Sequence, residues 1–194
     1  MIKTKKEYKE YLYYDRIALG KRKSKIRFVG DEIWQFEKLM RKTEYYKNCR
    51  KDFTGKIYGF LLQYIYYKKR IKLGFSIPLN VFGPGLSIAH YGTIVVNGNA
   101  VIGKNCRIQE TVTIGATNGS SKAPKLGDNV FIGSGARIIG DINVADDIAI
   151  GANAVVVNSF NEKGITIAGV PAKKISDNNS HDNLCQDIKE MKLL

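Results

Sequence analysis

The segment LGDNVFIGSGARIIGDINVADDIAIGANAVV, residues 126–156, carries an aliphatic residue at every sixth position. Within it these residues are Leu126, Ile132, Ile138, Val144, Ile150 and Val156. The same spacing precedes the segment at Val96, Ile102, Ile108 and Ile114. A helix repeats every 3.6 residues and a flat strand every two, so neither explains a period of six. The period predicts a triangular parallel coil, in which three short strands form each turn of about 18 residues.

The residues between the aliphatic positions fit the same coil. Glycine follows the aliphatic residue in five hexads, at Gly103, Gly115, Gly127, Gly133 and Gly151. A small or β-branched residue often stands four positions after it, as at Ala100, Cys106, Val112, Val130, Ala136, Ile148 and Ala154. Glycine suits a corner where two backbones approach closely.

Composition narrows the class of protein. The 194 residues are 44% hydrophobic, which indicates a globular chain with a sizeable core. No apolar stretch reaches the roughly 18 residues of a membrane span, and the Lys-rich N-terminus is not followed by the apolar run of a signal peptide. Three cysteines without a pairing pattern fit a reducing compartment. We therefore expect a cytoplasmic protein.

Charge divides the chain into unequal parts. Residues 1–76 hold 21 of the 31 Lys and Arg but only 8 of the 18 acids, a net charge of +13, and the remainder is neutral. Ten of the eleven tyrosines also lie there. This shift predicts a basic, aromatic-rich helical part over 1–75, the coil over 76–175 and a tail over 176–194.

Three helices are expected in the basic part. The first spans Lys3–Leu19, and a basic connector from Lys21 to Gly30 follows it. The second spans Asp31–Cys49, with an apolar stripe at Ile33, Trp34, Phe36, Leu39 and Met40. The third spans Thr54–Ile71, with a stripe at Ile57, Tyr58, Leu61, Leu62 and Ile65. We interpret both stripes as packing surfaces within the protein.

Two segments interrupt or end the coil. The run GATNGSSKAPK, residues 115–125, contains no apolar inward residue by the count and is expected to project as a loop. The run ITIAGVPAKKI, residues 165–175, is expected to be a closing strand. The polar tail could form a helix or stay disordered.

His90 is the candidate for chemistry. Counting back six from Val96 places it at an inward position, and histidine titrates near neutral pH, as a general base must. The other histidine, His181, lies in the polar tail. Two histidines and scattered cysteines do not make a metal site, and no phosphate-binding glycine loop or nucleophile elbow is present. If the coil is an enzyme, His90 is its base and no metal takes part.

Four stretches carry a resemblance to a known family. They read HYGTIVVNGNAVIGKNCRIQETVTIGA, APKLGDNVFIGSGARIIGDINV, IGANAVVVNSF and IAGVPAKKI, in residues 90–116, 123–144, 150–160 and 167–175. In this order they resemble the hexapeptide-repeat acyltransferases, specifically the serine acetyltransferase branch. The similarity covers about residues 76–175.

The resemblance implies a left-handed parallel β-helix that forms homotrimers, with acetyl-CoA bound between subunits. His90 matches the family histidine that deprotonates an acceptor hydroxyl. The matching CoA-groove residues are Ala116 and Thr117 in the loop, Ser134 and Ala152 at coil corners, and Lys173 near the CoA phosphates. A helical N-terminal part could build hexamers from trimers.

Departures from the family pattern concern the acceptor. A carboxylate that supports the family histidine aligns near Ser76, and an acid directly before the histidine is Ala89 here. The Arg-His pair that recognises serine reads Lys122-Ala123, which leaves Lys122 alone to meet a carboxylate. Glu110, on the coil next to His90, is a candidate replacement acid, although it could equally be a solvated surface residue. A sugar or surface-polysaccharide acceptor therefore fits better than L-serine, which remains the alternative.

A different class of function is a polyanion-binding scaffold. The net charge of +13 would raise affinity for nucleic acid or an anionic membrane. The basic part lacks a recognisable nucleic-acid-binding motif, so nucleic acid is the weaker interpretation. Peripheral contact with the inner membrane surface is compatible with acetyl transfer to a lipid-linked glycan.

Overall fold

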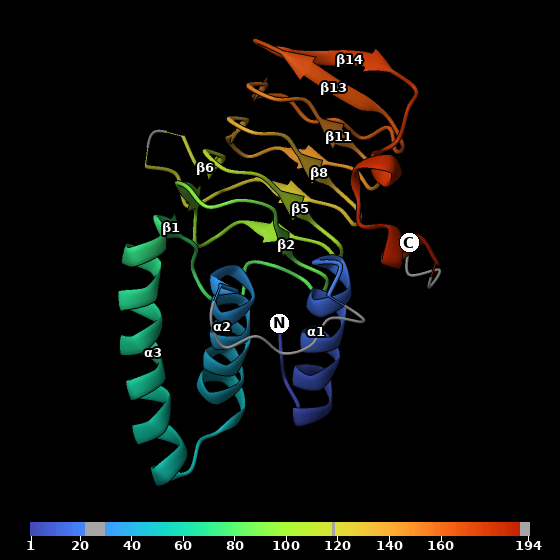
Figure 1. The fold of residues 1–194 in the computed structure, drawn as a ribbon. Helices are drawn as coiled ribbons and strands as arrows, with labels where there is room; N and C mark the ends of the chain where they lie inside the picture. Colours follow the sequence, from blue (N-terminus) through green and yellow to red (C-terminus); the bar gives the residue numbers. More distant parts are fainter. Residues whose placement is uncertain (22–29, 118, 191–194) are drawn as a thin grey trace.

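The computed structural model describes residues 1–21, 30–117 and 119–190. Three helices stand side by side at one end of a coil of short strands, and the coil rises away from them (Figure 1). Most of the expected basic connector, residues 22–29, lies outside the described residues, as do Asn118 and residues 191–194.

The three expected helices are present with small shifts at their ends. They are α1 (Lys5–Ala18), α2 (Glu32–Cys49) and α3 (Phe53–Leu73). Thr4 caps α1 by accepting the Glu7 amide at 3.1 Å, and Asp52 caps α3 by accepting the Gly55 amide at 3.0 Å. Gly74 ends α3 at φ 76°, a left-handed conformation that glycine adopts without steric cost.

The packing face of α3 differs from the expected stripe. Its buried residues are Gly55, Gly59, Leu62 and Tyr66, whereas Ile57, Leu61 and Ile65 are exposed. The glycines decide this orientation because they let the helix approach α2 closely. A Cβ added at Gly59 would lie 3.5 Å from the Cβ of Tyr46. In α2 the expected stripe is largely confirmed, since Phe36 and Met40 are completely buried.

The coil consists of three sheets, one on each side of a triangle, and all strands pair in parallel except β13 with β14. The first sheet orders β1 (Phe75–Ser76), β3 (Ile94–Val96), β6 (Thr113–Gly115), β9 (Arg137–Ile139) and β12 (Val155–Val156). The second orders β10 (Asn143–Val144), β7 (Lys125–Leu126) and β4 (Val101–Ile102). The third orders β14 (Ala172–Ser176), β13 (Thr166–Gly169), β11 (Ala149–Ile150), β8 (Phe131–Ile132), β5 (Arg107–Ile108) and β2 (Ser87–Ile88).

The hexad positions form the core, as the sequence predicts. Ile108, Ile114, Ile132, Ile138 and Ile150 are completely buried. Each such side chain contributes about 1.5–3 kcal/mol through removal of apolar surface from water. The same cluster includes Phe36, Met40 and Tyr66 of the helices, so the helical part and the coil share one core. The division at residues 75 and 76 into separate domains stays a prediction.

A buried ion network joins the helices to the first turn of the coil. Arg41 of α2 bonds both oxygens of Asp15 of α1, at 2.7 and 3.2 Å, and Glu44 at 3.1 Å. All three side chains are almost completely inaccessible. Arg41 also donates to two coil carbonyl oxygens, those of Phe82 and Gly83. Asp15 accepts from two coil amides, those of Gly85 and Leu86. The network holds α1, α2 and the coil in one arrangement.

Two expectations about the coil need correction. Within the expected loop, Ala123 is only 3% exposed and belongs to the core, so the run does contain an inward apolar residue. The closing segment is not one strand but an antiparallel hairpin, β13 and β14, because the chain reverses at the cis Val170–Pro171 peptide bond.

The tail returns along the coil to the helices. It forms a short 3-10 helix, Ser180–Asn183, and α4 (Gln186–Glu190). Ile188 packs against Ile17 and Ala18 of α1, and His181 Nε2 lies 2.8 Å from Asp147 Oδ1 on the coil. Among the described residues, no helix is long and apolar enough to cross a membrane.

Candidate active site

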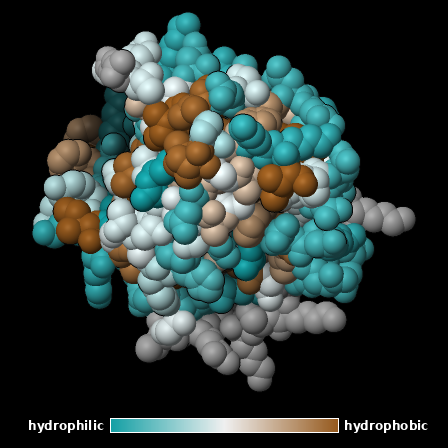
Figure 2. All heavy atoms as spheres, turned by 90° about the horizontal axis from the view of Figure 1, so that it is seen from above, coloured by the Kyte–Doolittle hydropathy of each residue, from teal (hydrophilic) through white to brown (hydrophobic). Residues whose placement is uncertain are grey.

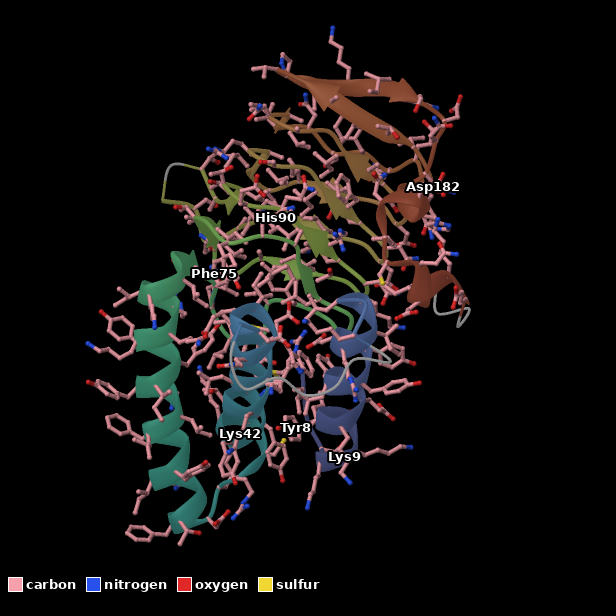
Figure 3. The ribbon with its side chains drawn as sticks, in the orientation of Figure 1. Tyr8, Lys9, Lys42, Phe75, His90 and Asp182 are labelled. Atoms are coloured by element: carbon pink, nitrogen blue, oxygen red, sulfur yellow. The ribbon has the colours of Figure 1, made fainter. Side chains whose placement is uncertain are left out.

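Four of the candidate residues lie at one corner of the triangle, where the third sheet turns into the first. Ile88, Ile108, Ile132 and Ile150 pair with one another in register. His90, Glu110, Ser134 and Ala152 each stand two positions after one of these paired residues. The strand register therefore aligns the four residues along this edge. We call this edge the His90 corner; His90 is labelled in Figure 3.

His90 itself points outward, contrary to its expected inward position. Ile88 and Val96 lie eight positions apart, whereas their partners Ile108 and Ile114 lie six apart. The first turn of the corner thus contains two extra residues, which break the six-residue count. The buried positions nearby are Ile88 and Ile94, and His90 is exposed. An exposed imidazole is accessible to a bound substrate.

Glu110 is held in place by the coil above it. Its Oε1 accepts the Ser134 hydroxyl at 2.5 Å, and the Ser134 amide donates to Gln109 Oε1 at 2.9 Å. The Oε2 atom of Glu110 is shielded from solvent and has no hydrogen-bond partner in the protein. The Ser134 hydrogen bond, with a smaller contribution from the charge of His90, lowers the pKa of Glu110. Glu110 is therefore a carboxylate at neutral pH, with one oxygen free for a further donor.

Tight backbone contacts surround this carboxylate. Gly92 has φ 133°, and a Cβ there would lie 3.0 Å from the Cβ of Glu110, so a larger residue would displace Glu110. Thr111 follows Glu110 at φ 57°, an unusual conformation for a β-branched residue. The equivalent positions on the next two coils are Gly135 and Asn153, residue types that adopt a positive φ more easily. Backbone strain therefore lies next to Glu110.

The other candidate residues lie elsewhere in the single chain. Ala116, Thr117 and Lys122 follow β6, at the corner between the first and second sheets, which we call the loop corner. Lys122 is exposed and pairs with Asp141 at 2.9 Å. Lys173 is exposed on β14 at the far end of the coil. Ala116, Thr117 and Lys122 do not reach the His90 corner within one chain, because the first sheet separates the two corners. Lys173 instead pairs with Ala168 on the third sheet, whose neighbouring strand β11 leads to Ala152.

A cavity of about 280 Å³ lies where α3 meets the first coil turn, and its lining includes Arg70, Gly74 and Ser76. Ser76 is the residue near which the resemblance places the family carboxylate. Arg70 Nη2 lies 3.4 Å from Ser76 Oγ, and its Nε donates to the Phe75 carbonyl. A Cβ at Gly74 would lie 3.6 Å from the Gly92 carbonyl, so the cavity adjoins the turn that carries His90. A guanidinium thus stands where an acid was expected from the family pattern.

Sequence reasoning missed two residues of this region, Gln109 and Arg70. A signal for Gln109 was present, because the run QET follows the inward Ile108, where the next coils read GSG and GAN. Arg70 gave no signal, since it lies among the lysines that end α3.

Chemically, the corner offers an exposed imidazole in register with an oriented carboxylate. This combination can accept a proton from a hydroxyl group. Among the residues described by the structure, no three His, Cys, Asp or Glu side chains are placed to hold a metal ion.

Comparison with known proteins gives two kinds of similarity. No family model matches the chain. The serine acetyltransferase of Buchnera aphidicola is 34% identical over 132 residues, which are 64% of this chain and 50% of the relative. The chain thus spans about half the length of this curated relative.

Solved structures extend the similarity to the helices. The serine acetyltransferase of Brucella abortus in complex with coenzyme A superposes with a TM-score of 0.67 at 27% identity, covering 90% of this chain and 70% of that one. The Neisseria gonorrhoeae enzyme in complex with serine gives 0.65 at 26% identity, covering 89% and 70%. These matches confirm the predicted left-handed β-helix with a helical N-terminal part. In the sequence of its coil and in its overall fold, the chain is thus similar to the serine acetyltransferases, one of which is described as a bacterial hexapeptide-repeat transferase.

Proposed function

We propose that this protein is an acetyl-CoA-dependent O-acetyltransferase. The observation that carries the proposal is the His90 corner, where an exposed imidazole lies in register with the Glu110 carboxylate on a coil similar to those of serine acetyltransferases. His90 accepts the proton of an acceptor hydroxyl while the hydroxyl oxygen forms a bond to the thioester carbonyl carbon. The carbon–sulfur bond then breaks, and CoA leaves as the thiol after taking up a proton. A positioned base contributes about 10²–10⁴ to such a rate.

Glu110 takes the supporting role in this proposal. With Ser76 and Ala89 in place of the family carboxylates, it is the acid that the strand register aligns with His90. Its oxygen Oε2 has no protein partner and is shielded from solvent, so in this proposal it accepts a hydrogen bond from the imidazole or the acceptor once the side chains adjust to a bound substrate. A carboxylate so placed also matches the ammonium group of an amino acid.

L-Serine is the acceptor that the comparisons favour over a sugar. Each relative described above is named a serine acetyltransferase, and one was solved with serine. A serine carboxylate needs a cation, and Arg70 beside the His90 turn is a second candidate for this role besides Lys122. A sugar hydroxyl remains the second candidate acceptor. Two observations favour it: Lys122 is engaged by Asp141, and Ala123 is buried where the family has histidine.

The proposed acetyl-CoA groove lies between two subunits of a homotrimer. Ser134 and Ala152 line the His90 corner, whereas Ala116 and Thr117 lie at the loop corner of the same chain. A groove formed by the His90 corner of one subunit and the loop corner of the next brings both sets to one ligand. Ala152 is exposed and small, so it leaves room for a ligand to reach the backbone.

The test is release of thiol from acetyl-CoA, measured with L-serine and with a panel of sugars and nucleotide sugars. Turnover with serine supports L-serine as the acceptor, and turnover with a sugar alone supports a sugar hydroxyl as the acceptor. Failure to bind CoA, measured by calorimetry on the full chain, would overturn the proposal of acetyl transfer.

A further inference from the structure

The outward face of α3 is apolar, aromatic and basic. Six residues at alternating spacings of four and three form one stripe along the helix: Phe53, Ile57, Phe60, Tyr64, Tyr67 and Ile71. Their exposed fractions run from 56 to 77%, as high as 77% at Phe53 and 76% at Phe60. We call this stripe the α3 face. It lies opposite the buried glycine face, and at its C-terminal end Tyr67 and Ile71 also line the cavity beside the first coil turn.

The position of α3 makes this face accessible. The helix forms one edge of the helical layer, and many of its side chains project away from α2 (Figure 3). Elsewhere exposed hydrophobic residues are more scattered. At the β13–β14 end of the coil, hydrophobic residues occur as separate groups among hydrophilic ones (Figure 2). A continuous exposed apolar stripe of this length marks an interaction surface.

The charges beside the stripe identify the kind of partner. α3 contains five cations and no acid: Lys56, Lys68, Lys69, Arg70 and Lys72. Of these, Lys56, Lys68 and Lys72 are exposed. The nearest carboxylates are already paired, Asp52 with Arg50 and Glu32 with Lys69. The α3 face therefore presents positive charge that nearby acids do not compensate.

Pairing with a second copy of the same face is disfavoured by these charges. Helices that associate along a stripe spaced by three and four usually carry opposite charges at the flanking positions. Here the flanking residues are Lys56, Gln63 and Arg70 on one side and Thr54, Leu61 and Lys68 on the other. An antiparallel pair of copies would place Lys56 of one copy against Arg70 of the other, and a parallel pair would gain no opposite charges.

We propose that the α3 face binds the surface of an anionic lipid bilayer, with α3 lying parallel to it. Phenylalanine and isoleucine enter the headgroup boundary, tyrosine hydroxyls remain at the polar level, and the lysines reach the lipid phosphates. Each lysine near such a surface contributes about 1 kcal/mol, which is about a fivefold change in partition. Because α3 runs roughly along the direction in which the coil rises, a flat α3 places the coil beside the bilayer surface (Figure 1).

The experiment is flotation of the full chain with vesicles of phosphatidylcholine alone and of phosphatidylcholine with phosphatidylglycerol. We expect binding to the anionic vesicles, weakened by salt. The double variant Phe53→Ser/Phe60→Ser should lower the partition coefficient at least about tenfold, because two large apolar side chains no longer insert. Its control is Val170→Ser/Ile175→Ser, which removes two hydrophobic residues of similar exposure from the other end of the coil.

A second pair of variants separates the α3 face from net charge. One variant removes three charges from α3, as Lys56→Gln/Lys68→Gln/Lys72→Gln, and should lose most vesicle binding. The other removes three charges from α1, as Lys5→Gln/Lys6→Gln/Lys9→Gln, and should keep it although both variants have the same net charge. Equal losses in both triple variants, or no binding of the wild type to anionic vesicles, would overturn the proposal. So would a loss of oligomers in the phenylalanine variant, measured by sedimentation velocity, without any change in vesicle binding. Circular dichroism checks that each variant is folded.

Discussion

At the residue scale, the two extra residues at the His90 corner matter most. They move His90 from an expected core position to the outer edge, while the strand register still keeps it level with Glu110. Glu110 in turn depends on Ser134 and on the absence of a side chain at Gly92. The candidate site is thus built from residues on three successive coils.

Replacing His90 by alanine should lower kcat by about 10²–10⁴, because the lowered pKa of the neighbouring Glu110 makes its carboxylate a much weaker base. CoA affinity, measured by calorimetry, and the melting temperature should change little, since the ring is exposed. Activity within threefold of wild type would exclude His90 as the base.

Glu110→Gln keeps a side chain that can still bond Ser134 but removes the negative charge. We expect kcat to fall by about tenfold or more, since oriented charge acts mainly on the transition state. The KM for acetyl-CoA should stay constant if Glu110 serves His90 or the acceptor. The matched control is Gln109→Glu, which changes the charge at the neighbouring position while leaving Glu110 in place. An unchanged kcat in Glu110→Gln would make Glu110 a surface acid.

Ala152→Trp tests the position of the CoA groove. An indole at this exposed corner should block the ligand and weaken CoA binding at least about tenfold, since it fills the space the ligand needs. The control is Val157→Trp, at another exposed position of the coil. Unchanged CoA affinity in Ala152→Trp would place the groove elsewhere.

At the element scale, buried charges orient the helices on the coil. The Arg41 network links α1, α2 and the coil segment of residues 82–86. A second buried acid, Glu37 of α2, accepts the Ile88 amide at 3.2 Å and leaves Oε2 without a partner. Glu37 thereby contacts the strand that leads into the His90 corner, because Ile88 is two residues before His90.

Arg41→Met should lower the free energy of unfolding by about 3–5 kcal/mol, because Asp15 and Glu44 would remain buried without their cation. Urea denaturation measures the change. Arg50→Met, which breaks the exposed pair with Asp52, should change the free energy of unfolding much less, because solvent screens this pair. Similar losses in the two variants would contradict the anchoring role of the buried network.

Glu37 should make stability depend on pH. Burial, and secondarily the charge of Asp15, raises the pKa of Glu37 well above its usual value. The folded state therefore binds this proton more tightly than the unfolded state, and stability falls as pH rises from the unfolded to the folded pKa. Glu37→Gln removes this slope, so the variant should gain stability relative to wild type as pH rises. Parallel stability curves of Glu37→Gln and wild type, followed upward from the ordinary glutamate pKa of about 4.3, would refute the assignment.

At the scale of the whole molecule, the proposal that both sets of candidate residues hold one ligand calls for more than one chain. The His90 corner and the loop corner lie on either side of the first sheet, so a trimer with shared sites fits their positions. We expect sedimentation to give a trimer or a multiple of it, and a dilute monomer to be inactive.

Mixing two inactive variants tests the shared site directly. His90→Ala and Ala116→Trp, refolded together, should recover about a quarter of wild-type activity, because some sites then combine two intact corners from different subunits. Refolding either variant alone provides the control. No recovery in mixed oligomers, verified by differential tagging, would show that each site lies within one chain.

The sequence by itself determined the coil, the three helices and the resemblance that points to His90, because hexad spacing, helix periodicity and capping are local properties of the chain. It could not determine that His90 faces outward, since that depends on two extra residues between strands paired in register. Nor could it determine that α3 turns its glycines inward and its aromatic stripe outward, because close approach to α2 outweighs the larger apolar side chains. The Arg41 network and the Glu110–Ser134 contact join residues 26 and 24 positions apart. Only the tertiary structure decided these features, because they depend on which distant segments come into contact.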